Sequence, residues 1–319
     1  MSEQHKITRE ELIDQLEFMK GKVINPSHGI FGPDSMFWRV GKYSTAFLGA
    51  GRAALLQNAH PWVATAIKQH SRTMEDPLSR FRGTFTNVFT MVYGSLDQVI
   101  DSSLRVHNIH QKIVGNIEAN AGEFHKGSYY QANEVQSMIW VHATLWETSV
   151  KMYELILGPL SEQEKALYYN ETKMFAYLFG IPEATLPDSW HDFLAYNERM
   201  WNSEQLVVND AAKEIAYFLF HFNRPLQPVM NRYEIVTSMM MPERLREQYG
   251  MSPVSPENIA LYEKYIASIR KAFPRLPRHL RYLPPYIEAR RRIAGKHKPG
   301  LITGSLNKLM LGRAKLVSA

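Results

Sequence analysis

The 319-residue sequence contains no cysteine. This absence excludes disulfides, thiolate nucleophiles, CxxC redox chemistry, iron–sulfur clusters, and zinc or haem bound through a thiolate. A bound metal would therefore be held by carboxylates or by some of the 12 histidines. The sequence also lacks an uncharged apolar run of about 18 residues, so no transmembrane helix is expected.

The first residues, MSEQHKITREELIDQ, lack the basic and apolar regions of a signal peptide. We therefore expect a cytoplasmic protein that is soluble or associates peripherally with a membrane. Its apolar content of 45% is enough for a substantial core in a chain of this length.

The alternation of apolar and polar residues that is typical of strands is nearly absent, and helical periodicity dominates. Capping boxes at Thr8 and Ser161 mark two helix starts, and Ser255 begins a helix that reaches about Phe273. Further helices are predicted at 44–59, 62–73, 77–93, 97–118, 133–157, 189–200 and 208–220. We predict one large all-α domain, divided along the chain into an N-terminal helix (1–28), a main helical body (29–269) and a basic tail (270–319).

The net charge of +6 is concentrated in the tail. Residues 270–319 contain 13 Lys and Arg and one acid, Glu288, whereas residues 1–269 contain 24 basic and 30 acidic residues. Apolar residues in the tail predict a short amphipathic helix around Gly304–Lys315 that contacts an anionic membrane surface. The alternative is that the tail arginines pack on the acidic body or pair with haem propionates. No nucleic-acid partner is expected, because no recognition module accompanies the charge.

Residues 49–54 fit the dinucleotide-binding pattern G-x-G-x-x-A. That pattern requires a strand before it and a parallel sheet after it, and the sequence predicts neither. The two glycines are better explained by the close approach of another backbone or of a flat ligand.

Two predicted helices carry histidine on an apolar face. In 97–118, His110 lies at the centre of an apolar stripe and His107 at its edge; the stripe consists of Val106, Ile109, Ile113 and Ile117. In 133–157, apolar and aromatic residues surround His142. A lone buried histidine is usually structural, but two on successive helices favour an imidazole ligand site. The spacings of dinuclear carboxylate sites and of H-E-x-x-H zinc sites are missing, so haem fits best.

Other polar residues stand among apolar ones. Arg80, Arg82 and Thr84 begin an aromatic helix, where they could orient dioxygen or pair with a haem propionate. The alternative is an ion pair between an arginine and the acids just before it. Arg52 and His60 are further candidates for cofactor contact, although a solvated helix face is the favoured explanation for both.

Five segments carry a resemblance to a known family. In chain order, GPDSMFWRV, GAGRAALLQNAHPWVATAIKQHS, DPLSRFRGTFTNVFTMVYGS, VHNIHQKIVG and SYYQANEVQSMIWVHATLWE resemble bacterial latex-clearing proteins (rubber oxygenases) and fungal MpaB-type oxygenases. The resemblance covers about residues 29–220. It implies an all-α fold with a globin-like core, a b-type haem, and oxygenation of olefinic isoprenoids by dioxygen.

The resemblance also implies roles for individual residues. His110 corresponds to the proximal iron ligand, and His142 to the family's second histidine. The distal motif Arg-x-x-Lys-Thr corresponds to residues 80–84, which keep Arg80 and Thr84 but have Gly83 in place of the lysine. Arg82 is the neighbouring basic residue, but on a helix it points about 100° away.

These features predict a haem-b oxygenase that acts on an apolar, unsaturated isoprenoid or lipid. His107, which stands where the family has an arginine, is a further cofactor contact. One alternative is a haem- or lipid-binding protein without turnover, suggested by Gly83. Another is a helical interaction protein whose buried histidines are purely structural.

Overall fold

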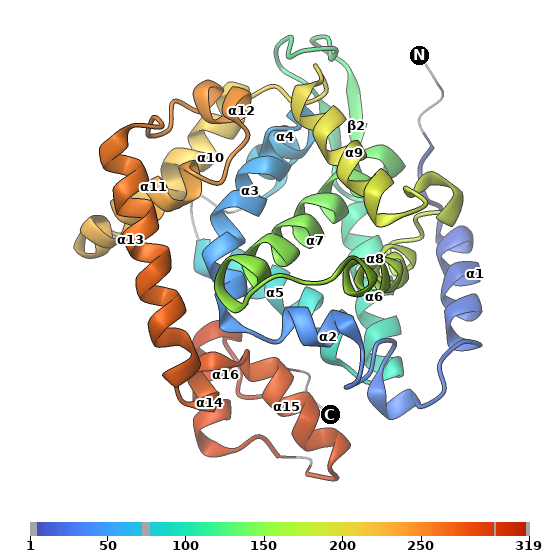
Figure 1. The fold of residues 1–319 in the computed structure, drawn as a ribbon. Helices are drawn as coiled ribbons and strands as arrows, with labels where there is room; N and C mark the ends of the chain where they lie inside the picture. Colours follow the sequence, from blue (N-terminus) through green and yellow to red (C-terminus); the bar gives the residue numbers. More distant parts are fainter. Residues whose placement is uncertain (1–4, 72–76, 297, 317–319) are drawn as a thin grey trace.

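The computed structural model describes residues 5–71, 77–296 and 298–316. The predicted all-α fold is confirmed (Figure 1). The α-helices are α1 (Arg9–Lys20), α2 (Met36–Gly41), α3 (Ala50–Asn58), α4 (Pro61–His70), α5 (Pro77–Tyr93), α6 (Leu96–His110), α7 (Val135–Leu157), α8 (Glu162–Tyr177), α9 (Trp190–Asn202), α10 (Asp210–His221), α11 (Gln227–Ser238), α12 (Glu243–Gln248), α13 (Pro256–Ala272), α14 (Arg278–Arg281), α15 (Pro284–Ile293) and α16 (Leu301–Leu311). Short 3-10 turns are η1 (Pro26–His28), η2 (Ser44–Gly49), η3 (Glu183–Thr185), η4 (Arg224–Leu226) and η5 (Phe273–Arg275). Strands β1 (Val114–Asn116) and β2 (Tyr129–Gln131) pair antiparallel.

Local capping signals set the helix starts that the sequence predicted. Thr8 and Ser161 each form a complete capping box, at the start of α1 and α8. The Ser255 side chain accepts the backbone N–H of Asn258 and begins α13. Each cap satisfies backbone donors that the first helical turn leaves without a partner.

The predicted helix 97–118 is too long. α6 ends at His110, and Val114–Asn116 instead pairs with Tyr129–Gln131. Gly115 sits so close to Tyr130 that a Cβ atom there would lie 2.6 Å from the Tyr130 hydroxyl. A larger residue here would have to displace the ends of the Tyr130 and Gln69 side chains, and glycine also weakens a helix.

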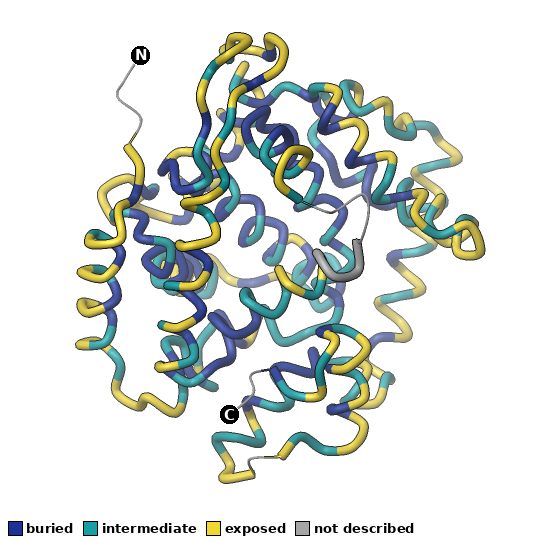
Figure 2. Tube along the Cα trace, turned by 180° about the vertical axis from the view of Figure 1, so that it is seen from behind, coloured by how far each residue is buried: buried dark blue, intermediate teal, exposed yellow. Residues whose placement is uncertain are grey.

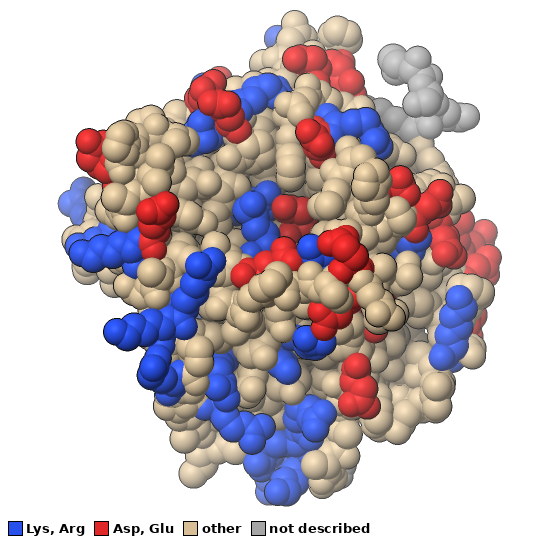
Figure 3. All heavy atoms as spheres, viewed as in Figure 1, with Lys and Arg blue, Asp and Glu red and all other residues tan. Residues whose placement is uncertain are grey.

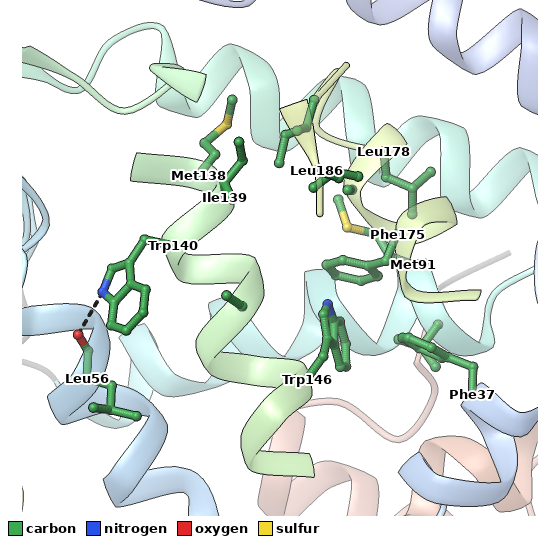
Figure 4. Packing of buried hydrophobic residues seen from close by; sticks show 14 of the residues in the cluster. Phe37, Leu56, Met91, Met138, Ile139, Trp140, Trp146, Phe175, Leu178 and Leu186 are labelled. Carbon is green, nitrogen blue, oxygen red and sulfur yellow. Dashed lines mark hydrogen bonds between the residues drawn. The ribbon is translucent and has the colours of Figure 1, made fainter. Parts of the chain in front are cut away.

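Helix α7 runs through the centre of the molecule, in contact with α2, α3, α8, α9 and α13 (Figure 1). Its two buried tryptophans point to opposite sides (Figure 4). The Trp140 indole N–H donates to the Leu56 carbonyl of α3 at 2.9 Å. Trp146 packs against Phe37 of α2 and Phe175 of α8, with ring centroids 4.6 and 4.8 Å away. The core is thus built around both faces of one helix, and exposed residues lie on the outer helices (Figure 2).

Both ends of the chain pack on this helical body. α1 buries Leu12, Leu16 and Met19 and contacts α6 and α8. At the other end, α15 and α16 pack on α5, and the Arg292 guanidinium donates to the Tyr93 carbonyl at 2.8 Å. Among the described residues, no helix combines the length and apolar character needed to cross a bilayer.

Candidate functional site

The C-terminal half of α6 differs from the predicted apolar stripe. Because the helix ends at His110, Ile113 and Ile117 do not continue its face. Ile109 is 47% exposed and His110 is half-buried, whereas His107 is buried. The prediction that His110 stands at the centre of the buried face is therefore wrong, and His107 is the histidine of α6 that points into the core.

His107 is held by Asn133, which lies just before α7. The Asn133 amide nitrogen is 3.3 Å from Nδ1 of His107. Nε2 of His107 is buried without a hydrogen-bond partner among the described residues. Burial lowers the pKa of His107, and the nearby Arg9 lowers it further. The ring is therefore uncharged at neutral pH.

His142 is buried on α7, as the sequence predicted. The Trp146 indole N–H, one turn further along, donates to Nδ1 of His142 at 3.0 Å. Nδ1 is thus an acceptor, so the proton of the neutral ring is on Nε2. Nε2 is buried and has no hydrogen-bond partner in the described part of the chain. Burial lowers the pKa of His142 to about 3, which keeps the ring uncharged at physiological pH.

An aromatic pair connects His142 with His110. Phe175 of α8 has its ring centroid 6.4 Å from that of His142, and Phe179, just after α8, lies 5.4 Å from Phe175. The ring of His110 packs against Phe179 at 6.3 Å. Figure 4 shows Phe175 beside Trp146, where α7 and α8 face each other. We call these five residues, His110, His142, Trp146, Phe175 and Phe179, the histidine–aromatic cluster.

The hydrogen bond from Trp146 bears on whether His142 suits a haem iron. A neutral imidazole binds iron through a lone pair while its other nitrogen, still protonated, donates to an acceptor. In His142 the Nδ1 lone pair accepts from Trp146, and Nε2 carries the proton, so this arrangement does not fit an iron ligand. His110 is half-buried at the end of α6, beside an aromatic ring, and this position fits a ligand at the rim of a haem site. Its role as the iron ligand remains a prediction.

Arg52 is buried, contrary to the solvated face expected for it. Only 1% of the residue is exposed, and its guanidinium pairs with the Glu147 carboxylate of α7. It also donates to the Thr148 hydroxyl at 2.6 Å and the Met240 carbonyl at 2.8 Å. These bonds join α3 to α7 and to the end of α11. A role of Arg52 in cofactor binding remains a prediction.

His60 is also buried rather than solvated. Its ring packs against both Trp62 and Phe124, with centroids 5.9 and 5.2 Å away, next to the loop of the hairpin. Nδ1 is buried without a hydrogen-bond partner among the described residues, and burial lowers the pKa of His60 to about 4. His60 thus lies in a separate aromatic environment, and its contact with a cofactor is still only predicted.

The predicted distal residues lie on the first turns of α5. The Arg80 side chain lies outside the described residues. Arg82 donates to the Leu309 carbonyl of α16 at 3.2 Å, so its described hydrogen bond joins α5 to the tail. Thr84 and Gly83 are exposed, and a Cβ atom at Gly83 would meet no atom within 4 Å. The part of these residues in dioxygen handling remains a prediction.

Sequence reasoning missed two partners of the candidate residues. Trp146 follows His142 by four residues, a spacing that brings side chains together on a helix and could have indicated their hydrogen bond. Glu147 is the partner of Arg52, but these two residues are 95 positions apart and no local signal connects them. Among the described residues, no three His, Asp or Glu side chains gather to hold a metal ion. Haem iron needs only one such protein ligand.

A comparison with protein families matches residues 38–271 to the catalytic domain described as "ER-bound oxygenase mpaB/B'/Rubber oxygenase". The chain belongs to this family. The match to the MpaB/rubber oxygenase catalytic domain contains every candidate residue and the whole histidine–aromatic cluster. Neither a curated protein nor a solved structure gave a match to the chain. Membership therefore indicates oxygenase chemistry, and the α6–α7–α8 region is where the Phe175–Phe179 pair connects two candidate histidines.

Proposed function

We propose that this MpaB/rubber oxygenase family member is a haem-b-dependent oxygenase that uses dioxygen on an apolar, unsaturated isoprenoid or lipid. The observation that carries the proposal is the family match over residues 38–271. The histidine–aromatic cluster supports it, because His110 and His142 come from different helices and pack on Phe179 and Phe175, which contact each other.

The proposal gives each residue of the cluster a role. Bound haem would supply the iron on which dioxygen chemistry takes place. His110 would hold the iron from the end of α6. Phe175 and Phe179 exclude water from the space between the two histidines. His142 stays neutral, because its pKa is about 3, and offers one uncharged N–H donor at Nε2. Trp146 fixes the tautomer and orientation of that ring.

The α5 residues complete the proposal on the distal side. Arg80 and Thr84 provide polar groups that orient dioxygen, and Arg82, bound to α16, fixes the position of the first turns of α5. Gly83 leaves open space where rubber oxygenases have a lysine. A lipid substrate would need little more than apolar surface and these few donors, because it carries no charge to neutralise.

Titration of the purified protein with haemin tests the ligand assignment. We expect a Soret band in the visible spectrum of the wild type and its loss or strong shift in His110→Ala, since one imidazole supplies the only protein bond to iron. His142→Ala should reduce occupancy less. His221→Ala is a matched control, because His221 is an exposed histidine on α10 and should leave the spectrum unchanged. Equal spectra of wild type and His110→Ala would refute the assignment, and the reverse order of effects would move it to His142.

The second candidate is a haem- or lipid-binding protein without turnover, which the missing lysine at Gly83 favours. Oxygen uptake with an isoprenoid substrate separates the two: uptake by the haemin-loaded protein supports an oxygenase, and binding without uptake supports the second candidate. If no Soret band forms in any variant, the haem-dependent oxygenase and the haem-binding protein are both ruled out, and only lipid binding without haem remains of the second candidate.

A further inference from the structure

Helix α16 exposes large apolar side chains that an ordinary surface helix would bury. Its buried positions are Thr303, Gly304, Asn307 and Leu311, so three of the four are small or polar. Its most exposed side chains are instead apolar: Leu301 is 93% exposed and Leu309 is 70% exposed. A surface helix normally buries the apolar stripe and exposes the polar one. Burial of Leu311 and the packing of Met310 account for only part of the apolar surface of α16, so polar contacts must also favour this rotation.

Hydrogen bonds to Glu288 of α15 help to fix that rotation. The Asn307 side-chain amide donates to the Glu288 carboxylate at 2.6 Å, and the backbone N–H of Leu316 donates to it at 3.0 Å. Since Asn307 must face α15 to make this bond, the opposite side of α16 faces solvent. Leu301, Ile302 and Leu309 lie on that side with Lys308, and we call these four residues the outer face of α16.

Basic residues dominate the described part of the tail that carries the outer face. Glu288 is the only acid in residues 270–319, and its hydrogen bonds turn it inward. The basic residues include exposed Lys296 and Lys298 just before α16 and Lys308 on it. In Figure 3, Lys and Arg gather over the lower part of the molecule, where α14 and α15 lie in Figure 1. Exposed apolar side chains next to basic residues can bind a partner whose surface contains both hydrocarbon and negative charge.

We propose that the outer face of α16 docks on an anionic lipid bilayer. The leucines and isoleucine enter the boundary between headgroups and acyl chains, while the lysines stay at the level of the anionic headgroups. The bond to Glu288 holds α16 in this orientation before it meets the membrane, so docking needs no rearrangement of the helix.

Docking also places α5 beside the bilayer, because α16 is attached to it. Arg82 donates to the Leu309 carbonyl, and the backbone of Gly312, with a left-handed φ of 75°, ends α16 against the Arg82 side chain. Phe81, at the exposed start of α5, packs on Phe85. This second step rests on the proposed function: a lipid substrate would then reach the distal residues of α5 from the membrane.

Flotation with liposomes tests the docking and needs neither haem nor turnover. We expect the wild type to float with phosphatidylcholine vesicles containing phosphatidylglycerol, and to stay at the bottom with phosphatidylcholine alone. Leu301→Ser and Leu309→Ser should each weaken binding by about tenfold, the loss expected for one leucine no longer buried. Lys308→Glu should weaken binding at low salt and have less effect at high salt. All three positions are exposed, so these variants should keep the far-UV circular dichroism of the wild type.

Tyr217→Ser and Val229→Ser are matched controls, since both side chains are large, apolar and exposed on α10 and α11. They should float like the wild type. If the α16 variants float as well as the wild type, or the wild type binds no vesicles at low salt, the proposal is wrong. A dimer in light scattering that Leu309→Ser dissociates, without flotation, would instead identify the outer face as a contact between copies of this chain. Vesicle binding with no Soret band in the haemin titration would leave the docking intact and overturn only the proposed function.

Discussion

Replacing Arg52 should strongly destabilise the folded protein whether or not a cofactor is present. Arg52 is 1% exposed and Glu147 is 8% exposed, so Arg52→Met leaves a buried carboxylate without its partner. Removing one partner of a buried ion pair lowers the free energy of unfolding by about 3–5 kcal/mol. The lost bonds to Thr148 and the Met240 carbonyl place the expected cost in the upper part of that range.

The double variant Arg52→Met/Glu147→Met removes both charges and should be much more stable than Arg52→Met alone, because no buried charge is left unpaired. Urea unfolding followed by tryptophan fluorescence and by circular dichroism gives each free energy of unfolding, with and without haemin. A loss below about 1 kcal/mol for Arg52→Met, or additive effects of the two substitutions, would contradict this account. A loss that appears only with haemin would show that Arg52 acts on the cofactor.

Two further predictions concern pH and Gly83. The imidazoles of His60 and His142 take up a proton near pH 6.5 when unfolded but only near pH 4 and 3 when folded, so stability should fall as pH drops below 6.5. Each histidine contributes up to about 1.4 kcal/mol per pH unit to the slope of the free energy of unfolding against pH. The urea midpoint of His142→Leu should therefore vary less between pH 7 and 5 than that of the wild type. An equal change in the two proteins would contradict the burial of a neutral ring. Gly83→Ala and Gly83→Lys should stabilise α5 by about 0.5–1 kcal/mol, because the site is exposed, helical and open. If the family lysine acts on dioxygen, Gly83→Lys should also raise oxygen uptake relative to Gly83→Ala at equal haemin occupancy, and no difference between the two would show that the lysine is not needed.

Local signals in the sequence predicted most of the helices. The caps at Thr8, Ser161 and Ser255 act within one helical turn, so the sequence alone predicts them correctly. The end of α6 depends instead on a strand that pairs with Tyr129–Gln131, and helical periodicity gives no information about that pairing. The predicted tail helix at Gly304–Lys315 is found at Leu301–Leu311, because the left-handed Gly312 ends it.

The candidate site was predictable in part. His142 lies on a long apolar helix, and its burial follows from periodicity alone. The periodicity argument failed for His110, because it assumed a helix that continues past residue 110. It also failed for Arg52, whose buried position depends on a carboxylate 95 residues away. Long-range polar partners of this kind decide which charged residues are buried, and no pattern within one helix reports them.

The contacts of α1 have a consequence for the order of folding during synthesis. The backbone N–H of Ile7 donates to the Asn133 carbonyl, that of Val135 donates to the His5 carbonyl, and α1 packs on α8. The ribosome makes these partners more than a hundred residues after α1, which at roughly 10 residues per second is a delay on the order of ten seconds. Throughout that delay the apolar face of α1 lacks its docking surface on α8, and before α6 is made it lacks both of its helical partners. We therefore expect the nascent N-terminal helix to be an early substrate for ribosome-associated chaperones. We also expect α1 to become protected from proteolysis later than the α6–α8 region on which it packs.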